Sequence, residues 1–218
     1  MSATPGLLSV WNNIDAADED EFNAWYQGEH LAERLALPGV LSARRYAEIG
    51  VPRSYAAIYD TDGLAPLGSQ DYLERLGNPT PRTRAIMPRF RNMVRAASEV
   101  VSDIGDRGAK PGAVLACLEL RGPGVSATTL KVLEKTGLAQ IASAAVQRIR
   151  LANPNENATR VPNPEAKLRA KPDALPAPFV LVEGGAESAV RKAAAALGKA
   201  LGAPRPARIY ALIEARTK

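Results

Sequence analysis

The chain has 218 residues, of which 46% are hydrophobic and 23% charged, a composition typical of a folded globular protein rather than a disordered one. The net charge is +5, but the 28 basic residues are dispersed among 23 acidic ones without an RNA-binding or helix-turn-helix pattern, so we expect no nucleic-acid partner. No apolar run approaches the roughly 20 residues that span a bilayer, and the first residues lack the features of a signal peptide. We therefore expect a cytoplasmic protein without membrane contact. The single cysteine, Cys117, lies in an apolar run and excludes an intrachain disulfide.

Hydrophobic periodicity in the first half predicts elements in the order βαββαβ. They are a strand at 7–13, a helix at 18–37, strands at 40–47 and 54–60, a helical region at 64–87 and a strand at 90–101. Acidic residues crowd the start of the first helix, where unpaired amides and the helix dipole favour them, and Pro38-Gly39 ends it.

The second half repeats this order more faintly. Its elements are a strand at 112–120, a helix at 126–137, strands at 141–151 and 179–183, a helix at 186–201 and a strand at 207–215. The stretch 153–178 is rich in proline, which argues against regular structure there, and it carries the basic residues Arg160, Lys167, Arg169 and Lys171. We interpret it as a surface excursion; the alternative is an arm that covers a site or reaches a partner.

A single βαββαβ unit forms an antiparallel sheet with both helices on one face, so its other, apolar face must be covered. Two tandem units, 1–106 and 111–218, can cover each other. We therefore predict an α+β fold of two tandem ferredoxin-like units packed as an intrachain dimeric α/β barrel. The alternative is an open α+β sandwich with the halves edge to edge. Because the chain supplies both halves, we expect a monomer or a weak homodimer.

Several features of the first unit occur together in chain order. They are Trp25-Tyr26-x-x-Glu29-His30-Leu31, Pro38-Gly39, Arg44-Arg45-Tyr46, and Tyr55-Ala56-Ala57-Ile58-Tyr59. This pattern resembles EthD-like proteins of the dimeric α/β barrel superfamily. The resemblance implies the barrel fold and a range of chemistry, because that superfamily includes cofactor-free isomerases, polyketide cyclases and decarboxylases as well as haem-binding enzymes. The corresponding helix of the second unit carries neither a histidine nor an aromatic pair.

His30 is the only histidine, and histidine is the side chain whose ordinary pKa lies nearest neutrality. At 100° per residue the aromatic residues Phe22, Trp25 and Tyr26 share a helix face with Glu29, and His30 lies at its edge. The candidate catalytic residues are His30, Tyr26 and Tyr46. The candidate substrate-binding residues are Phe22, Trp25, Glu29, Arg44 and Tyr59. The competing interpretations are a surface histidine or a satisfied core histidine at position 30, a surface carboxylate at Glu29 and an exposed Arg44.

These residues favour a cofactor-independent proton-transfer enzyme (an isomerase, cyclase, dehydratase or decarboxylase) acting on an apolar, aromatic or polyketide-like small molecule. His30 would be the general acid/base, and Arg44 would hold negative charge. The alternative is a non-catalytic module that binds an apolar ligand or another subunit; haem binding through His30 is less favoured. One histidine among scattered carboxylates forms no recognised metal site, so we expect no metal.

Overall fold

The structure, a computed structural model, describes residues 4–108, 110–142, 146–162, 164–169 and 172–218. Its contacts divide the chain into two compact units. The first unit comprises Met1–Glu99, Asn155–Leu175 and Ile213–Lys218, and the second comprises Val100–Pro154 and Pro176–Leu212. Most of the proline-rich stretch therefore belongs by its contacts to the first unit, although it follows the second repeat's strands in sequence. Lys171 lies outside the described residues.

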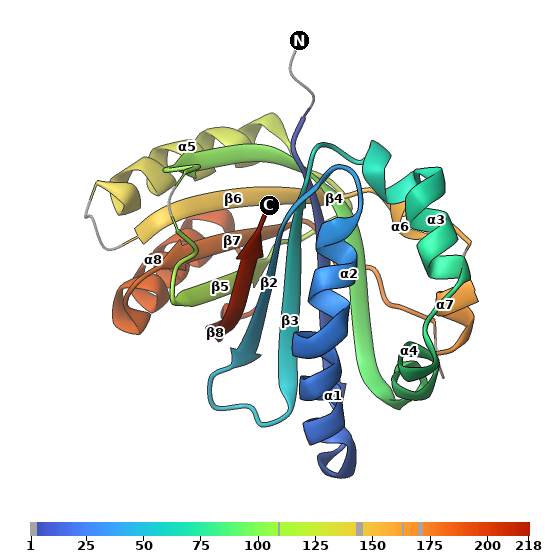
Figure 1. The fold of residues 1–218 in the computed structure, drawn as a ribbon. Coiled ribbons are helices and arrows are strands. Elements are labelled where there is room, and N and C mark those ends of the chain that lie inside the picture. The colour runs from blue at the N-terminus through green and yellow to red at the C-terminus, as the bar shows by residue number, and fades with distance from the viewer. Residues whose placement is uncertain (1–3, 109, 143–145, 163, 170–171) are drawn as a thin grey trace. The chain divides into compact units, whose positions relative to one another are not determined.

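The first unit has the predicted βαββαβ order. Its elements are β1 (Gly6–Ile14), α1 (Glu19–Trp25), α2 (Leu31–Ala36), β2 (Val40–Glu48), β3 (Ser54–Thr61), α3 (Gln70–Gly77), α4 (Pro81–Ile86) and the first part of β4 (Phe90–Gly105). β3 pairs antiparallel with both β1 and β2, and β4 pairs with the other edge of β1. Figure 1 shows α1 and α2 as one blue coil beside this sheet.

The helical region predicted at 64–87 consists of separate pieces. A 3-10 turn at Ala65–Gly68 precedes α3, and a break at Asn78-Pro79 separates α3 from α4. Each helix starts at a hydroxyl cap, because Ser69 accepts from the Tyr72 amide and Thr80 accepts from the Thr83 amide. The proline causes the break, since the residue before a proline avoids the helical conformation.

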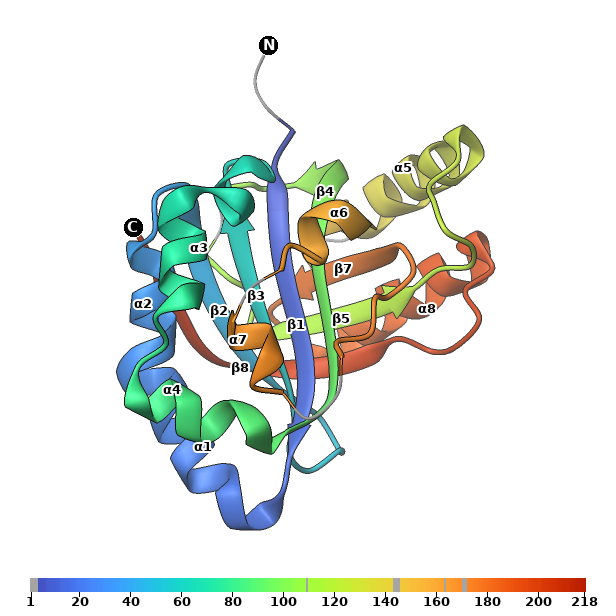
Figure 2. The same cartoon turned by 90° about the vertical axis from the view of Figure 1, so that its right-hand side faces the viewer.

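The arm, which we define as residues 155–175, carries two single-turn helices, α6 (Glu156–Thr159) and α7 (Pro164–Lys167). α7 contacts α3 of the same unit (Figure 2). Thr159 joins the arm to β4, because its hydroxyl accepts a hydrogen bond from the Ala97 amide at 2.9 Å. The alternative interpretation of this stretch, an arm over a candidate site, thus agrees with its position better than a plain surface excursion.

The second unit also has the predicted order of elements, with the end of its first helix and the start of the strand after it displaced. Its elements are the last part of β4, β5 (Val114–Glu119), α5 (Ala127–Ile141), β6 (Val146–Pro154), β7 (Phe179–Gly184), α8 (Glu187–Leu201) and most of β8 (Arg208–Thr217). α5 continues past Gly137, where a helix end was predicted. That glycine serves close packing instead, because a Cβ there would lie 2.9 Å from Ile104 Cδ1. β6 starts at Val146, and residues 143–145 of the strand predicted from Ile141 lie outside the described residues.

Hydrogen bonds join the strands of the described residues in the order β1-β3-β2-β8-β5-β7-β6-β4, which closes on itself, and β4 and β8 each contribute to both units. This confirms the predicted α+β fold of two ferredoxin-like units forming a dimeric α/β barrel within one chain. The alternative prediction of an open sandwich is wrong, because the strands of an open sandwich do not form a closed barrel. Among the described helices, none is long and apolar enough to cross a membrane.

Candidate active site

The aromatic segment lies on a helix with a π turn in its middle. α1 passes without a break into a π-helical turn at Tyr26–His30 and then into α2. The Leu31 amide donates to the Tyr26 carbonyl, an i→i−5 bond that adds one residue to the turn. The extra residue rotates His30 from the edge of the aromatic face onto it, so that the His30 and Trp25 rings lie 4.1 Å apart at 32°. Such turns occur frequently at functional sites.

Behind this turn the aromatic face is packed as core. Phe22 and Trp25 are fully buried, and the Trp25 Nε1 donates to the Thr83 hydroxyl at 3.1 Å. The Arg45 guanidinium lies 4.5 Å from the centroid of the Tyr26 ring and 4.8 Å from that of Phe22, within range of a cation–π interaction. Phe22 and Trp25 therefore support the site from behind rather than form the wall of its cavity.

A cavity of about 40 Å³ lies in the first unit against the π turn. Three predicted site residues line it, namely Tyr26, His30 and Tyr59. The other polar lining residues are Arg34, Tyr72, Arg95, Glu165 and Arg169. Its apolar lining is formed by Leu8, Val10, Leu76, Met87, Phe90 and Met93. Polar and apolar side chains thus line the cavity in similar numbers.

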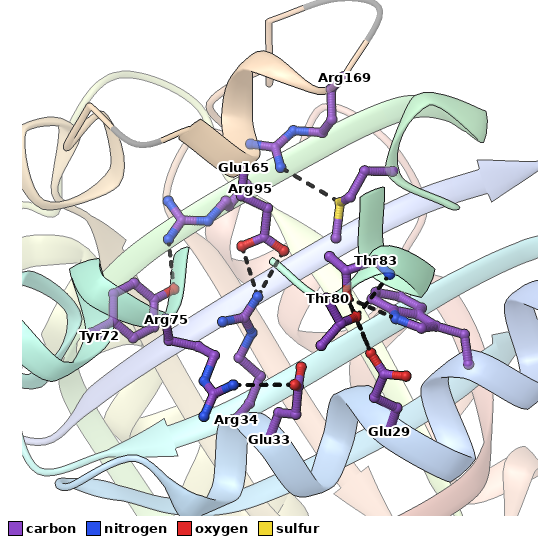
Figure 3. A network of polar contacts seen from close by, with 12 residues as sticks. Glu29, Glu33, Arg34, Tyr72, Arg75, Thr80, Thr83, Arg95, Glu165 and Arg169 are labelled. Carbon is purple, nitrogen blue, oxygen red and sulfur yellow. Dashed lines mark hydrogen bonds and ion pairs between the residues drawn. The ribbon is translucent and has the colours of Figure 1, made fainter. Parts of the chain in front are cut away.

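Arg34 and Glu165 form a buried ion pair in this cavity. The Arg34 Nη2 donates to both carboxylate oxygens of Glu165 at 2.7 Å, as Figure 3 shows. Both residues are almost completely buried, although Glu165 comes from the arm and Arg34 from α2. The arm therefore contributes a side chain to the cavity.

Three buried polar atoms around the cavity have no hydrogen-bond partner among the described residues: the His30 Nδ1, the Tyr59 hydroxyl and the Arg34 Nη1. Buried polar groups in folded proteins are nearly always satisfied, and leaving one without a partner costs about 1–3 kcal/mol. Three such atoms on one small cavity mark it as a place where a polar ligand or ordered water would be bound.

The surroundings of His30 hold it neutral. Burial lowers its pKa well below the usual 6.5, and the charges of Arg34 and Arg45 lower it further. Burial also raises the pKa of Tyr59 well above 10 and that of Tyr26 to about 12. At neutral pH the cavity therefore presents an uncharged imidazole, two protonated phenols and the Arg34 cation.

The structure separates Arg44 and Tyr46 from this cavity, although the sequence placed both in the site. On β2 and β3 the core-facing residues Ala43, Ala57 and Tyr59 pack under the helices. Side chains alternate along a strand, so Arg44 and Tyr46 point to the opposite face of the sheet. There Arg44 donates to both carboxylate oxygens of Asp60, at 2.8 and 2.7 Å.

Glu29 also lies outside the cavity, because the π turn moves it away as it moves His30 in. Its carboxylate accepts from the Thr80 hydroxyl and, at 3.4 Å, from that of Thr83 (Figure 3). It therefore joins the helix to the start of α4. This contact matches neither a substrate-binding role nor the free surface carboxylate of the competing interpretation.

Sequence reasoning missed the five polar lining residues besides Tyr26, His30 and Tyr59. Tyr72 had a local signal, since it shares an apolar stripe with Leu76 on α3. Arg34 follows His30 by four residues and had a signal too, but a regular helical wheel places it on a different face from the aromatic residues. Arg95, Glu165 and Arg169 had none, because only the packing of the arm against β4 brings them to the cavity.

The low pKa of His30 predicts how stability depends on pH. Below pH 6.5 the unfolded chain binds a proton at His30 and the folded chain does not, so the folded state loses stability as pH falls. The free-energy advantage of the wild type over His30→Gln should shrink by up to about 1.4 kcal/mol per pH unit between pH 6.5 and the folded-state pKa. Urea denaturation of both proteins at several pH values measures this. An advantage that stays constant from pH 7.5 to pH 5 would contradict the buried neutral histidine.

The cavity does not fit haem. Its volume is about 40 Å³, whereas pockets for small-molecule ligands and cofactors span roughly 300–1,000 Å³. Among the described residues no group of three or more His, Cys, Asp or Glu side chains is placed to hold a metal ion.

No protein-family model matches the chain, and no curated protein matches it in sequence. Solved structures do match it in fold. A protein provisionally named a monooxygenase from Fusobacterium nucleatum aligns with TM-score 0.61 and 10% identity over 100% of this chain and 96% of its own. An anthrone oxidase-like protein aligns with TM-score 0.60 and 9% identity over 98% and 92%. A haem-binding protein from Thermus thermophilus aligns with TM-score 0.55 and 12% identity over 97% and 92%. At these identities the comparisons show the fold alone, and they agree with the barrel that the strand order forms.

Proposed function

We propose that this protein is a cofactor-independent enzyme that moves a proton on a small planar molecule, with His30 as the general base. The observation that carries this proposal is the group of unpartnered buried atoms on one cavity: the His30 Nδ1, the Tyr59 hydroxyl and the Arg34 Nη1. A base, a neutral donor and a fixed cation are the groups needed to remove a proton and hold the charge that results.

The charge states support this assignment. A neutral imidazole can accept a proton from a C–H or O–H group at pH 7, which an imidazolium cannot, but the burial and the arginine charges that lower the pKa of His30 also make it a weaker base. Tyr59 stays protonated, so it can donate to an oxygen that gains negative charge, and Arg34 adds a positive charge beside it. These groups are held by helix and strand rather than by loops, and buried donors act more strongly where water is excluded.

The lining favours an aromatic or otherwise planar substrate. Leu8, Val10, Met87 and Phe90 supply apolar surface, and the Tyr26 and Tyr59 rings supply flat walls. The cavity, with a volume of about 40 Å³, holds only one or two water molecules. Substrate entry therefore requires displacement of a lining side chain. Among the lining residues, Glu165 and Arg169 come from the arm, and the others come from the sheet or from α1–α4 and their connections.

Proton exchange tests the proposal directly. Enolisable aromatic keto acids, beginning with phenylpyruvate, are incubated with the protein in D₂O, and loss of the proton next to the carbonyl is followed by NMR. We expect the wild type to accelerate exchange and His30→Gln to lose that acceleration. A panel on which the wild type and His30→Gln are indistinguishable from buffer would favour a non-catalytic binding module.

A further inference from the structure

We propose that Glu165 is a built-in competitor for the substrate and that the ligand of this cavity is a planar aromatic carboxylate whose carboxylate takes the place of Glu165 on Arg34. This inference rests on the proposed function for the identity of the site. It goes further by naming the chemical class of ligand and the side chain that the ligand displaces.

The ion pair uses only one of the two terminal nitrogens of the Arg34 guanidinium. Both oxygens of Glu165 accept from Nη2, at 2.7 Å each, and Nη1 is buried without a partner among the described residues. A carboxylate that lies in the plane of a guanidinium group can accept from two of its nitrogens, one to each oxygen, and this arrangement is stronger. Glu165 is held by a short arm helix and does not reach that geometry. A free carboxylate is not tethered and can adopt it.

The charges around the cavity favour an anionic ligand. Three arginines line it, namely Arg34, Arg95 and Arg169; Glu165 pairs with Arg34, and Asp173 pairs with Arg169. Arg95 donates to the Thr159 carbonyl and the Tyr72 hydroxyl, both neutral groups. Arg45 adds a fourth cation behind Tyr26, and its Nη2 donates to the Asn23 amide oxygen, also neutral. Arg95 and Arg45 thus carry positive charge that neither Glu165 nor Asp173 balances.

A hollow beside the cavity offers space for a displaced Glu165 side chain. Arg95 and Arg169 line both the cavity and an adjoining hollow of about 410 Å³, which is formed largely by the arm. Arg160 and Lys167 line that hollow too, so a released Glu165 carboxylate would meet cations there. Arg169, held by Asp173 at 2.6 Å, lies at the boundary between the two spaces. Withdrawal of Glu165 would join them into a volume that accommodates an aromatic ring.

Benzoate tests the inference, with benzamide as its neutral analogue. Isothermal titration of wild type and Glu165→Gln with each compound measures the two affinities. We expect Glu165→Gln to bind benzoate at least about tenfold more tightly than wild type, because the competing carboxylate is gone, and to bind benzamide as wild type does. The matched control is Glu156→Gln, which removes an exposed arm carboxylate paired with Arg160 and should leave both affinities unchanged.

Equal benzoate affinities in wild type and Glu165→Gln would overturn the inference, as would an equal gain for benzamide, which would indicate only a larger cavity. If Glu165→Gln does not fold, Glu165→Asp keeps the charge and shortens its reach, and it should shift benzoate affinity in the same direction. The readout is binding rather than turnover. Tightened benzoate binding without proton exchange would refute the proposed function alone, whereas proton exchange without tightened binding would refute this inference alone.

Discussion

Replacing Arg34 by methionine is expected to lower the free energy of unfolding by roughly 3–5 kcal/mol. The substitution leaves the Glu165 carboxylate, which is only 3% exposed, buried without its partner. The cost of taking a charge out of water is then no longer offset by the ion pair, and this cost is much larger than the net value of the pair itself. Urea denaturation at pH 7.5 measures the change.

The same arm offers a matched control. Arg160 and Glu156 also form an arginine–glutamate pair, but their side chains are 58% and 61% exposed, so Arg160→Met should cost no more than about 1 kcal/mol. The double variant Arg34→Met/Glu165→Leu removes both buried charges and should recover most of the loss. Equal effects of Arg34→Met and Arg160→Met would show that Glu165 does not stay buried against Arg34.

The fold could be predicted from the sequence because it depends on local patterns. Short runs rich in apolar and aromatic residues define β1, β2 and β3, and the acids before α1 and the Pro38-Gly39 turn after α2 bound the first helix. Two units with one apolar sheet face each leave few ways to cover those faces. The displaced boundary at the end of α5 came from treating Gly137 as a stop, whereas the close approach of Ile104 is what requires a glycine there.

The site could be predicted only in part, for three separate physical reasons. The π turn shifts the phase of the helix by one residue, which brings His30 and Arg34 in and turns Glu29 out, and no periodicity reveals such a shift in advance. Strand alternation puts Arg44 and Tyr46 on one face of the sheet, but the sequence does not say which face the helix covers. Glu165 meets Arg34 across 131 positions of sequence, so no local pattern encodes that contact. The EthD-like resemblance stays a prediction.

His30→Gln is expected to lower the rate of enzyme-catalysed proton exchange by roughly 10²- to 10⁴-fold, the usual contribution of a positioned general base. Glutamine keeps a polar side chain of similar reach but cannot accept a proton at neutral pH. Since the neutral His30 ring has an unpartnered Nδ1, its removal breaks no hydrogen bond at that atom. The free energy of unfolding at pH 7.5 should therefore change far less than the activity does.

Two tyrosine variants separate catalysis from packing in that experiment. Tyr59→Phe removes a cavity hydroxyl and should slow exchange, because a donor to the charged oxygen is lost. Tyr46→Phe removes an equally buried hydroxyl on the opposite sheet face and should leave the rate unchanged. The rates are measured by NMR in D₂O at saturating phenylpyruvate, and benzoate titration of each variant checks that the cavity still binds its ligand. If His30→Gln exchanged protons as fast as wild type while binding benzoate equally well, His30 would not be the base. If all three variants lost activity in proportion to their loss of stability, the histidine would be a structural part of the aromatic core that Trp25 and Phe22 form behind it.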